Sequence, residues 1–176
     1  MLNARNTLPE TLVTTRLTLR KPVSSDLADL VALANNPNVV APTATMPFPY
    51  LEEHAEAFVA GVDDPTTPRA YAIANADDRL MGVVSLKFAP DTAPELGYWL
   101  GEPHWGHGYT AEAAKGLLDA VRHNGSIPKV RARVLQSNPA SARVLDKLGF
   151  VVIERTLSSI QRHLGQPLLL LEWRAA

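Results

Sequence analysis

The feature that most restricts the fold is a strand, helix and strand pattern between residues 95 and 135. In ELGYWL, residues 95–100, side chains alternate between two faces, which predicts a strand. Apolar residues then recur at helical spacing over 113–121, and residues 130–135 alternate again. A helix of this length between two strands forms a crossover, so we expect the two strands to lie parallel in one sheet.

Shorter patterns predict the remaining elements. The expected strands lie around 17–19, on both sides of a turn at 77–78, near 150–155 and at 167–173, and the expected helices at 26–34, 51–60 and 139–148. Residues 35–50 contain four of the fourteen prolines, which predicts an irregular loop. The leucines at 168–171 predict a last strand buried on both faces. These 176 residues suit one α+β domain, 1–176.

Composition excludes several classes of function. Lys plus Arg total 17 against 18 for Asp plus Glu, so no basic field is available and we expect no nucleic-acid partner. The chain has no cysteine, which excludes a cysteine thioester and thiolate metal ligands. No apolar run approaches the roughly 18 residues of a membrane span, and the first residues lack the apolar segment of a signal peptide. We therefore expect a cytoplasmic protein with no membrane partner.

Glycines before the central helix predict an anion site. Gly106 and Gly108 leave bare backbone where unpaired N–H groups and the positive end of the helix dipole attract phosphate. A P-loop would carry lysine and a hydroxyl where His107 and Gly108 stand, which excludes nucleoside triphosphate hydrolysis. A dinucleotide fingerprint fits the spacing with Ala111 last, but the acidic residue expected about twenty positions later is missing. The pyrophosphate of acyl-coenzyme A is the third candidate.

Two longer motifs resemble the GNAT N-acetyltransferase superfamily, in its RimJ/RimL branch of ribosomal-protein N-terminal acetyltransferases. They are W-G-x-G-Y-x-x-E-A at 105–113 and N-x-x-S-x-x-x-x-x-K-x-G-F at 138–150, and the likeness extends over nearly the whole chain. The resemblance implies a mixed, mostly antiparallel sheet with helices on both faces. It also implies a central parallel strand pair, splayed to hold the co-substrate acetyl-CoA.

The resemblance further implies the residues that bind acetyl-CoA. The amides that match the family's pyrophosphate loop belong to Trp105, Gly106, His107, Gly108, Tyr109 and Thr110. Thr110 departs from the small residue expected in that loop. The pantetheine arm would lie between the strands at 95–101 and 130–135, with the acetyl carbonyl held by backbone near Trp99 and Leu100. Asn138 precedes Pro139 and is expected to cap a helix, while Arg143 either reaches a coenzyme phosphate or points to solvent.

Acetyl transfer needs a base for the attacking amine and an acid for the departing thiolate. Glu95 resembles the family's strand-borne glutamate and is the candidate base, directly or through a water, although it equally suits a solvated strand start. Ser141 falls at the third helical position, where the resemblance suggests a hydroxyl near the thioester sulfur, and no tyrosine lies nearby in the sequence. Glu112 is explained by the helix dipole alone. No fourth ligand joins Glu102 and its neighbouring histidines, so no metal is expected.

The acceptor amine is left open by the sequence. A protein or peptide N-terminus is the first expectation, because an α-amine with a pKa of about 8 needs a weaker base than a lysine amine of about 10.4. A small amine, such as an aminoglycoside or a polyamine, and a non-catalytic acetyl-CoA sensor are the alternatives. Apolar residues of the 35–50 loop either line an acceptor pocket or anchor the loop to the core. An exposed terminal strand would support a homodimer.

Overall fold

One sheet forms the centre of the molecule. The computed structural model describes residues 5–175, and within them eight strands follow the order β1-β2-β3-β4-β5-β6-β8-β7. The strands are β1 (Leu12–Val13), β2 (Thr18–Arg20), β3 (Arg69–Ala74), β4 (Leu80–Lys87), β5 (Glu95–Leu100), β6 (Lys129–Leu135), β7 (Val151–Leu157) and β8 (Pro167–Arg174). Neighbours in the sheet are antiparallel except β5 and β6, which are parallel. The mixed, mostly antiparallel sheet is confirmed.

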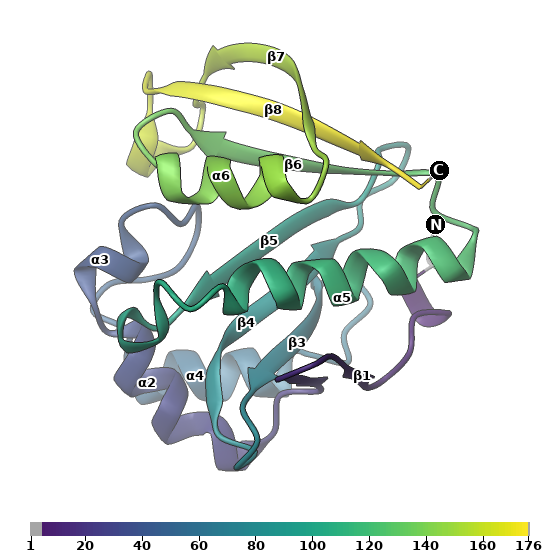
Figure 1. Ribbon diagram of the computed structural model, residues 1–176. Coiled ribbons are helices and arrows are strands. Elements are labelled where there is room, and N and C mark those ends of the chain that lie inside the picture. Colours follow the sequence, from purple (N-terminus) through teal and green to yellow (C-terminus); the bar gives the residue numbers. More distant parts are fainter. Residues whose placement is uncertain (1–4, 176) are drawn as a thin grey trace.

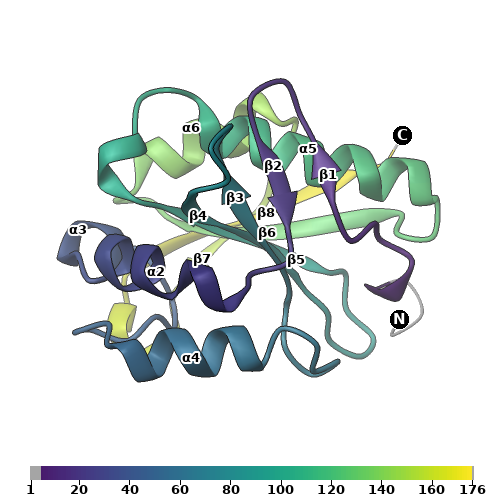
Figure 2. The same ribbon diagram turned by 90° about the horizontal axis from the view of Figure 1, so that it is seen from below.

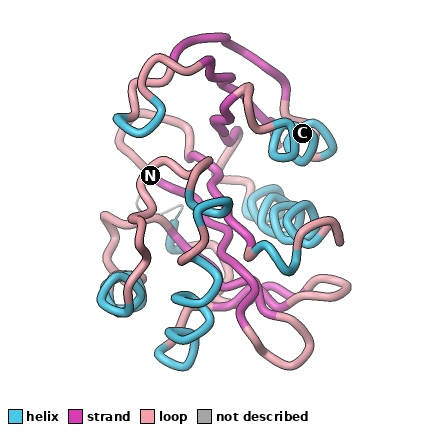
Figure 3. Tube along the Cα trace, turned by 90° about the vertical axis from the view of Figure 1, so that its left-hand side faces the viewer, coloured by secondary structure: helices cyan, strands magenta, loops and turns pink. Residues whose placement is uncertain are grey.

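Helices lie on both faces of this sheet, as expected. They are α2 (Leu27–Ala34), α3 (Pro37–Val40), α4 (Glu52–Ala60), α5 (Tyr109–Asn124) and α6 (Pro139–Lys147), with short 3-10 turns at Ser24–Asp26, Glu102–His104 and Gln161–His163. Figures 1 and 2 show α5 and α6 on one side of the sheet and α2 and α4 on the other. Figure 3 looks along the layers, with helices on both sides of the magenta strands. Among the described helices, none combines the length and apolar character needed to cross a bilayer.

The strands β5 and β6 separate along their length. Within the described residues their single bridged pair is Glu95 opposite Arg131, where the Arg131 amide donates to the Pro94 carbonyl at 2.8 Å. By contrast, β4 and β5 stay paired from Lys87 and Glu95 to Gly82 and Leu100. Figure 1 shows β5 and β6 meeting at one end and parting toward the starts of α5 and α6. The expected splayed pair is confirmed, and the gap opens in the middle of the sheet.

Each face of the sheet has its own apolar cluster. On one face Leu117 and Val121 of α5 pack with Val130 of β6, and on the other Leu30 of α2 packs with Val83 of β4. Burying each side chain of this size stabilises the fold by roughly 1.5–3 kcal/mol. The second cluster contains no residue of β6, β7 or β8 among its buried members, so the α2/α4 layer covers only one part of the sheet.

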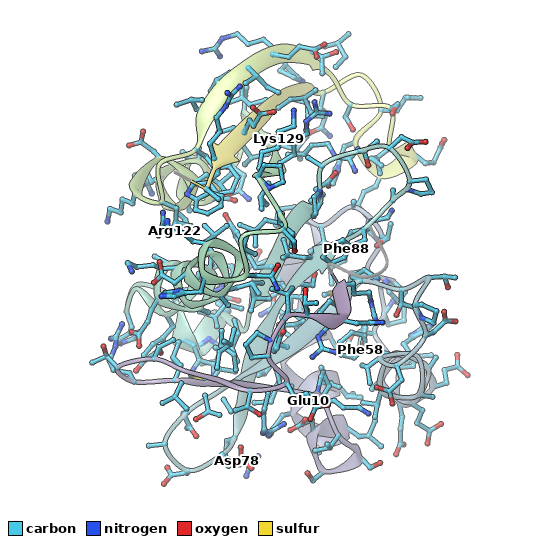
Figure 4. The ribbon with its side chains drawn as sticks, turned by 90° about the vertical axis from the view of Figure 1, so that its right-hand side faces the viewer. Glu10, Phe58, Asp78, Phe88, Arg122 and Lys129 are labelled. Carbon is cyan, nitrogen blue, oxygen red and sulfur yellow. The ribbon has the colours of Figure 1, made fainter. Side chains whose placement is uncertain are left out.

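The cluster on the α5 side extends to the far part of the sheet. Arg122, labelled in Figure 4, projects from α5, and its guanidinium carbon lies 5.1 Å from the ring centroid of Trp173 on β8. Such a contact of a cation with an aromatic face contributes about 0.5–1 kcal/mol at an exposed site. Helix α5 therefore contacts strands on both sides of the gap between β5 and β6.

The end of the chain differs from the prediction in two ways. Strand β8 lies between β6 and β7, so the exposed edge belongs to β7, where Val151, Ile153 and Leu157 are exposed. Residues 168–170 are half-buried instead of buried, because the α2/α4 layer does not reach this part of the sheet. The expectation that β8 is covered on both faces is wrong, and the exposed terminal strand of the sheet is β7.

The proline-rich segment also contains more order than predicted. Residues 37–40 form the helical turn α3, where the Asn36 side chain accepts a hydrogen bond from the Asn38 amide at 2.9 Å and Pro37 stands in the first position. Asparagine before proline is a strong helix-start signal, which the count of prolines in 35–50 obscured.

Candidate active site

The loop before α5 presents backbone amides that have no partner. Gly106 and Gly108 have φ angles of 80° and 79°, in the left-handed region that glycine adopts without strain. The amides of residues 106–111 donate to no acceptor among the described residues. A Cβ added at Gly106 would meet no atom within 4 Å, so the space beside the loop is open. With the positive end of the α5 dipole behind it, the loop suits an anion such as a diphosphate.

Side chains fasten this loop to the sheet. The Trp105 indole donates to the Leu100 carbonyl at 2.7 Å, which ties the loop to the end of β5. Arg16, which precedes β2, donates from Nη1 to the His107 carbonyl at 3.0 Å and from Nε to Glu112 at 2.6 Å. These contacts leave the amides of residues 106–111 free, whereas the Trp105 amide, expected to join them, donates to the Glu102 carbonyl at 3.1 Å.

Glu112 is committed to these contacts. Its Oε1 accepts from the Thr14 hydroxyl and from the Arg16 amide, both at 2.7 Å. Burial opposes ionisation, but these hydrogen bonds and the Arg16 charge outweigh it and hold the pKa of Glu112 below its usual range. The Arg16 guanidinium also lies 4.5 Å from the Tyr109 ring centroid. Glu112 therefore joins the N-terminal segment to the start of α5, in addition to its favourable place in the dipole.

A cavity of about 1110 Å³ connects this loop with the gap between β5 and β6. The sequence-predicted site residues that line it are Glu95, Trp99, Leu100, Trp105, Gly106, Gly108, Tyr109, Thr110, Asn138, Ser141 and Arg143. His107 is the exception, because its carbonyl bonds to Arg16 and its ring stacks on Tyr109 with centroids 5.6 Å apart. The structure thus brings nearly all the predicted residues, from three separate segments, to one cavity.

Ser141 is fixed by two neighbours. Asn138 accepts a hydrogen bond from the Ser141 amide at 3.1 Å, which confirms the predicted helix cap and the third helical position of Ser141. The Ser141 Oγ lies 2.7 Å from the Tyr98 Oη. Burial raises the pKa of the Tyr98 phenol, and the hydrogen bond to Ser141 offsets only part of this effect. The phenol stays protonated, so it can donate to Ser141 and leave the serine hydrogen for a third group.

Glu95 lies at the closed end of the gap, where β5 and β6 are bridged. Its Oε1 accepts from the Arg133 Nε at 2.9 Å, and the two side chains are 33% and 37% exposed. The second carboxylate oxygen, Oε2, bonds to no described residue. The ion pair therefore orients the carboxylate and leaves one oxygen for an amine or a water.

Backbone groups of β5 alternate between β4 and the gap. The Gly101 amide donates to the Met81 carbonyl of β4 at 2.8 Å. By the alternation of an antiparallel pair, Trp99 also faces β4, whereas Tyr98 and Leu100 face the gap. The amides of Tyr98 and Leu100 are therefore the donors of β5 that face the gap, so of the two expected positions Leu100 faces it and Trp99 does not.

Comparison with known proteins agrees with this geometry. The model of an acetyltransferase (GNAT) domain matches residues 16–151. The chain belongs to the GNAT acetyltransferase family. A curated relative, the uncharacterised N-acetyltransferase p20 of Bacillus licheniformis, is 29% identical over 147 residues, which cover 80% of this chain and 82% of the relative.

Two solved structures share the fold of this GNAT acetyltransferase. The RimL ribosomal L7/L12 α-N-protein acetyltransferase, in complex with coenzyme A, has a TM-score of 0.79 and 19% identity, covering 94% of this chain and 98% of its own. The spermidine N-acetyltransferase of Vibrio cholerae, in complex with CoA and spermine, has a TM-score of 0.76 and 20% identity, covering 90% and 95%. The fold therefore serves acceptors of different kinds.

Two residues of this GNAT site were missed from the sequence. Alternation placed Tyr98 on one face with Leu96 and Leu100, and although no tyrosine lies near Ser141 in the sequence, β5 supplies one in space. The signal was the phenol itself, since a buried tyrosine hydroxyl usually has a partner. Arg16 gave no local signal, because its contact with Glu112 spans 96 positions of the chain.

Proposed function

We propose that this GNAT acetyltransferase transfers the acetyl group of acetyl-CoA to the α-amine of a protein or peptide N-terminus, by direct attack. The observation that carries the proposal is the row of free amides at residues 106–111, continuous with a cavity through the parted strands. Free amides at a helix start match the acceptor oxygens of a diphosphate, and the gap offers unpaired strand backbone to the amide-bearing pantetheine arm. The absence of cysteine favours attack without an acyl-enzyme.

The chain's own residues divide the binding of acetyl-CoA among them. The coenzyme supplies an acetyl group activated as a thioester. Amides of residues 106–110 hold the diphosphate, and Arg143, which lines the cavity, reaches a phosphate. The amides of Tyr98 and Leu100, which face the gap, are the donors that polarise the acetyl carbonyl.

Proton transfer is assigned to two side chains on opposite sides of the gap. Ser141, which is hydrogen-bonded to the Tyr98 phenol, protonates the departing thiolate. Glu95 takes the proton of the attacking amine with its free Oε2, directly or through a water. An α-amine of pKa about 8 asks less of any base than a lysine amine of about 10.4, which favours the α-amine as acceptor.

The family likeness alone supports more than one acceptor, because a relative in fold acts on an α-N-protein terminus and another on spermidine. The lower pKa of an α-amine favours the protein terminus. A small-amine acetyltransferase and an acetyl-CoA sensor without turnover are the outcomes that would replace it.

Matched glycine variants test coenzyme binding. Gly106 and Gly125, near the two ends of α5, have φ of 80° and 69°, and an added Cβ meets nothing within 4 Å at either site. Alanine should therefore cost similar unfolding free energy at both, about 1–2 kcal/mol. Only Gly106→Ala should weaken acetyl-CoA binding. The Kd should rise by about tenfold or more if the hydrogen bond from one backbone amide to a charged phosphate oxygen is lost. If calorimetry gave both variants the same Kd for acetyl-CoA, the amides of residues 106–111 would not be the diphosphate site.

Turnover separates the remaining alternatives. Thiol release from acetyl-CoA is followed with peptides carrying a free N-terminal amine, with matched peptides whose N-terminus is blocked and whose lysine is free, and with small amines. Acetylation of the free N-termini supports the proposal. Turnover with small amines alone replaces the acceptor, and binding of acetyl-CoA without turnover indicates a sensor.

A further inference from the structure

We infer that the acceptor is a primary amine with an apolar, uncharged group beside it, and that di- and polyamines are poor acceptors. The inference rests on the proposed acetyl transfer and concerns the part of the cavity on the α2/α4 side of the sheet. There Gly97 and Trp99 of β5 and Ser85 of β4 share one face with Glu95. An amine that reaches Glu95 must place its neighbouring group against this wall.

Apolar and aromatic side chains form that wall. The cavity is lined there by Met46 and Tyr50 from the loop, Phe58 from α4, Val83 and Trp99, and all five belong to or pack against one buried cluster. Phe58 is labelled in Figure 4 on its helix. Tyr50 is only 6% exposed, and burial raises the pKa of its phenol. An apolar, largely buried surface of this kind favours an apolar group on the acceptor.

The charges that line the cavity have the wrong sign for a second ammonium. Among its described lining residues Glu95 is the one carboxylate, whereas Arg133, Arg143 and Lys147 are cationic. Glu95 is already paired with Arg133 at 2.9 Å. A diamine would therefore bring its second cation into a partly dry space that offers no free anion.

An unpaired buried cation is strongly disfavoured unless an opposite charge compensates it. Because the cavity is open to water at its mouth, the full penalty does not apply. We expect at least about tenfold lower kcat/KM for a diamine than for a monoamine of equal length and similar basicity.

The test compares hexylamine with cadaverine, which have the same number of non-hydrogen atoms, and peptides that begin with Phe with peptides that begin with Lys. Thiol release from acetyl-CoA gives kcat/KM for each. Preference for hexylamine and for Phe-first peptides supports the inference. Equal or better use of cadaverine overturns it while the acetyltransferase function stands. Acetyl-CoA binding without turnover of any amine overturns the proposed function, and the inference with it.

A matched pair of variants tests the charge argument directly. Ser85 lines the cavity, is half-buried and lies opposite Gly97. Ser85→Asp places a carboxylate on the acceptor wall, and Ser85→Asn places a neutral side chain of the same size. The Asp variant should raise the cadaverine to hexylamine ratio of kcat/KM by at least about tenfold over the Asn variant. Equal ratios in the two variants, with acetyl-CoA binding and thermal unfolding alike, would overturn the role of charge.

Discussion

Replacing Tyr98 by phenylalanine tests the pair of hydroxyls in the site. The substitution removes the 2.7 Å hydrogen bond to Ser141 and keeps the ring that packs against the core. A neutral hydrogen bond is worth about 0.5–1.5 kcal/mol, so kcat should fall by about 2- to 13-fold. The Kd for acetyl-CoA, measured by calorimetry, should not change, because Tyr98 contributes its backbone amide to that site in the proposal.

Two further variants make the result specific. Tyr71 is 1% exposed and donates to the Pro9 carbonyl at 2.6 Å without lining the cavity, so Tyr71→Phe should lower stability and leave kcat unchanged. In a Ser141→Ala background, Tyr98→Phe should have no further effect on kcat, because the group it orients is gone. If the double variant instead showed the product of the two single reductions in kcat, the idea that Tyr98 acts through Ser141 would be refuted.

Three other predictions concern separate parts of the site. Glu95→Gln should lower kcat by about a hundredfold or more if the carboxylate is the base, with unchanged acetyl-CoA binding, whereas unchanged kcat would transfer the role to solvent. Glu112→Gln should lower the free energy of unfolding by about 0.5 kcal/mol at neutral pH, since Arg16 is 45% exposed. The pKa of Glu112 is lowered in the folded chain, so the difference in unfolding free energy between the two proteins should be fully present above the usual glutamate pKa. It should vanish as pH falls through the lowered value. Denaturant titrations across acid pH would show the opposite trend if the assignment were wrong. The Nη1 of Arg162 donates to the Val40 and Thr43 carbonyls at 3.1 Å and so holds the loop that carries Met46 and Tyr50. Arg162→Ala should therefore raise KM for the acceptor about fivefold without changing KM for acetyl-CoA. Equal changes in both KM values would contradict this role.

The sequence predicted those features that depend on neighbours in the chain. The strand at Glu95–Leu100, the glycine loop, α5 and β6 follow from periodicity and from residues that end or begin helices. The same holds for Asn138, whose capping contact with Ser141 spans three residues. These features are local, so one sequence suffices to predict them.

Features that depend on the order of strands were beyond this reasoning. Whether β8 or β7 forms the edge is decided by which strand pairs with β6, and both carry similar apolar residues. The contacts of Tyr98 with Ser141 and of Arg16 with His107 join segments 43 and 91 positions apart. Alternation correctly assigned the face on which Tyr98 lies, but it could not show which helix supplies the partner of its hydroxyl.

Within the part of the chain that the structure describes, Glu95 and Arg131 are the one bridged pair between β5 and β6, so the sheet is weakly joined there. Elsewhere in the sheet each strand is hydrogen-bonded to its neighbours along its length, so separating one strand also disturbs the next. Between β5 and β6 that cooperativity is interrupted, and β6, β8 and β7 form one part of the sheet, joined to the rest through α5 and α6 and through the contacts of Arg162 and His163 with the loop after α3. A ligand bound in the gap and contacting both parts of the sheet would hold them together. It would raise the free energy of unfolding in proportion to the logarithm of its concentration over its Kd.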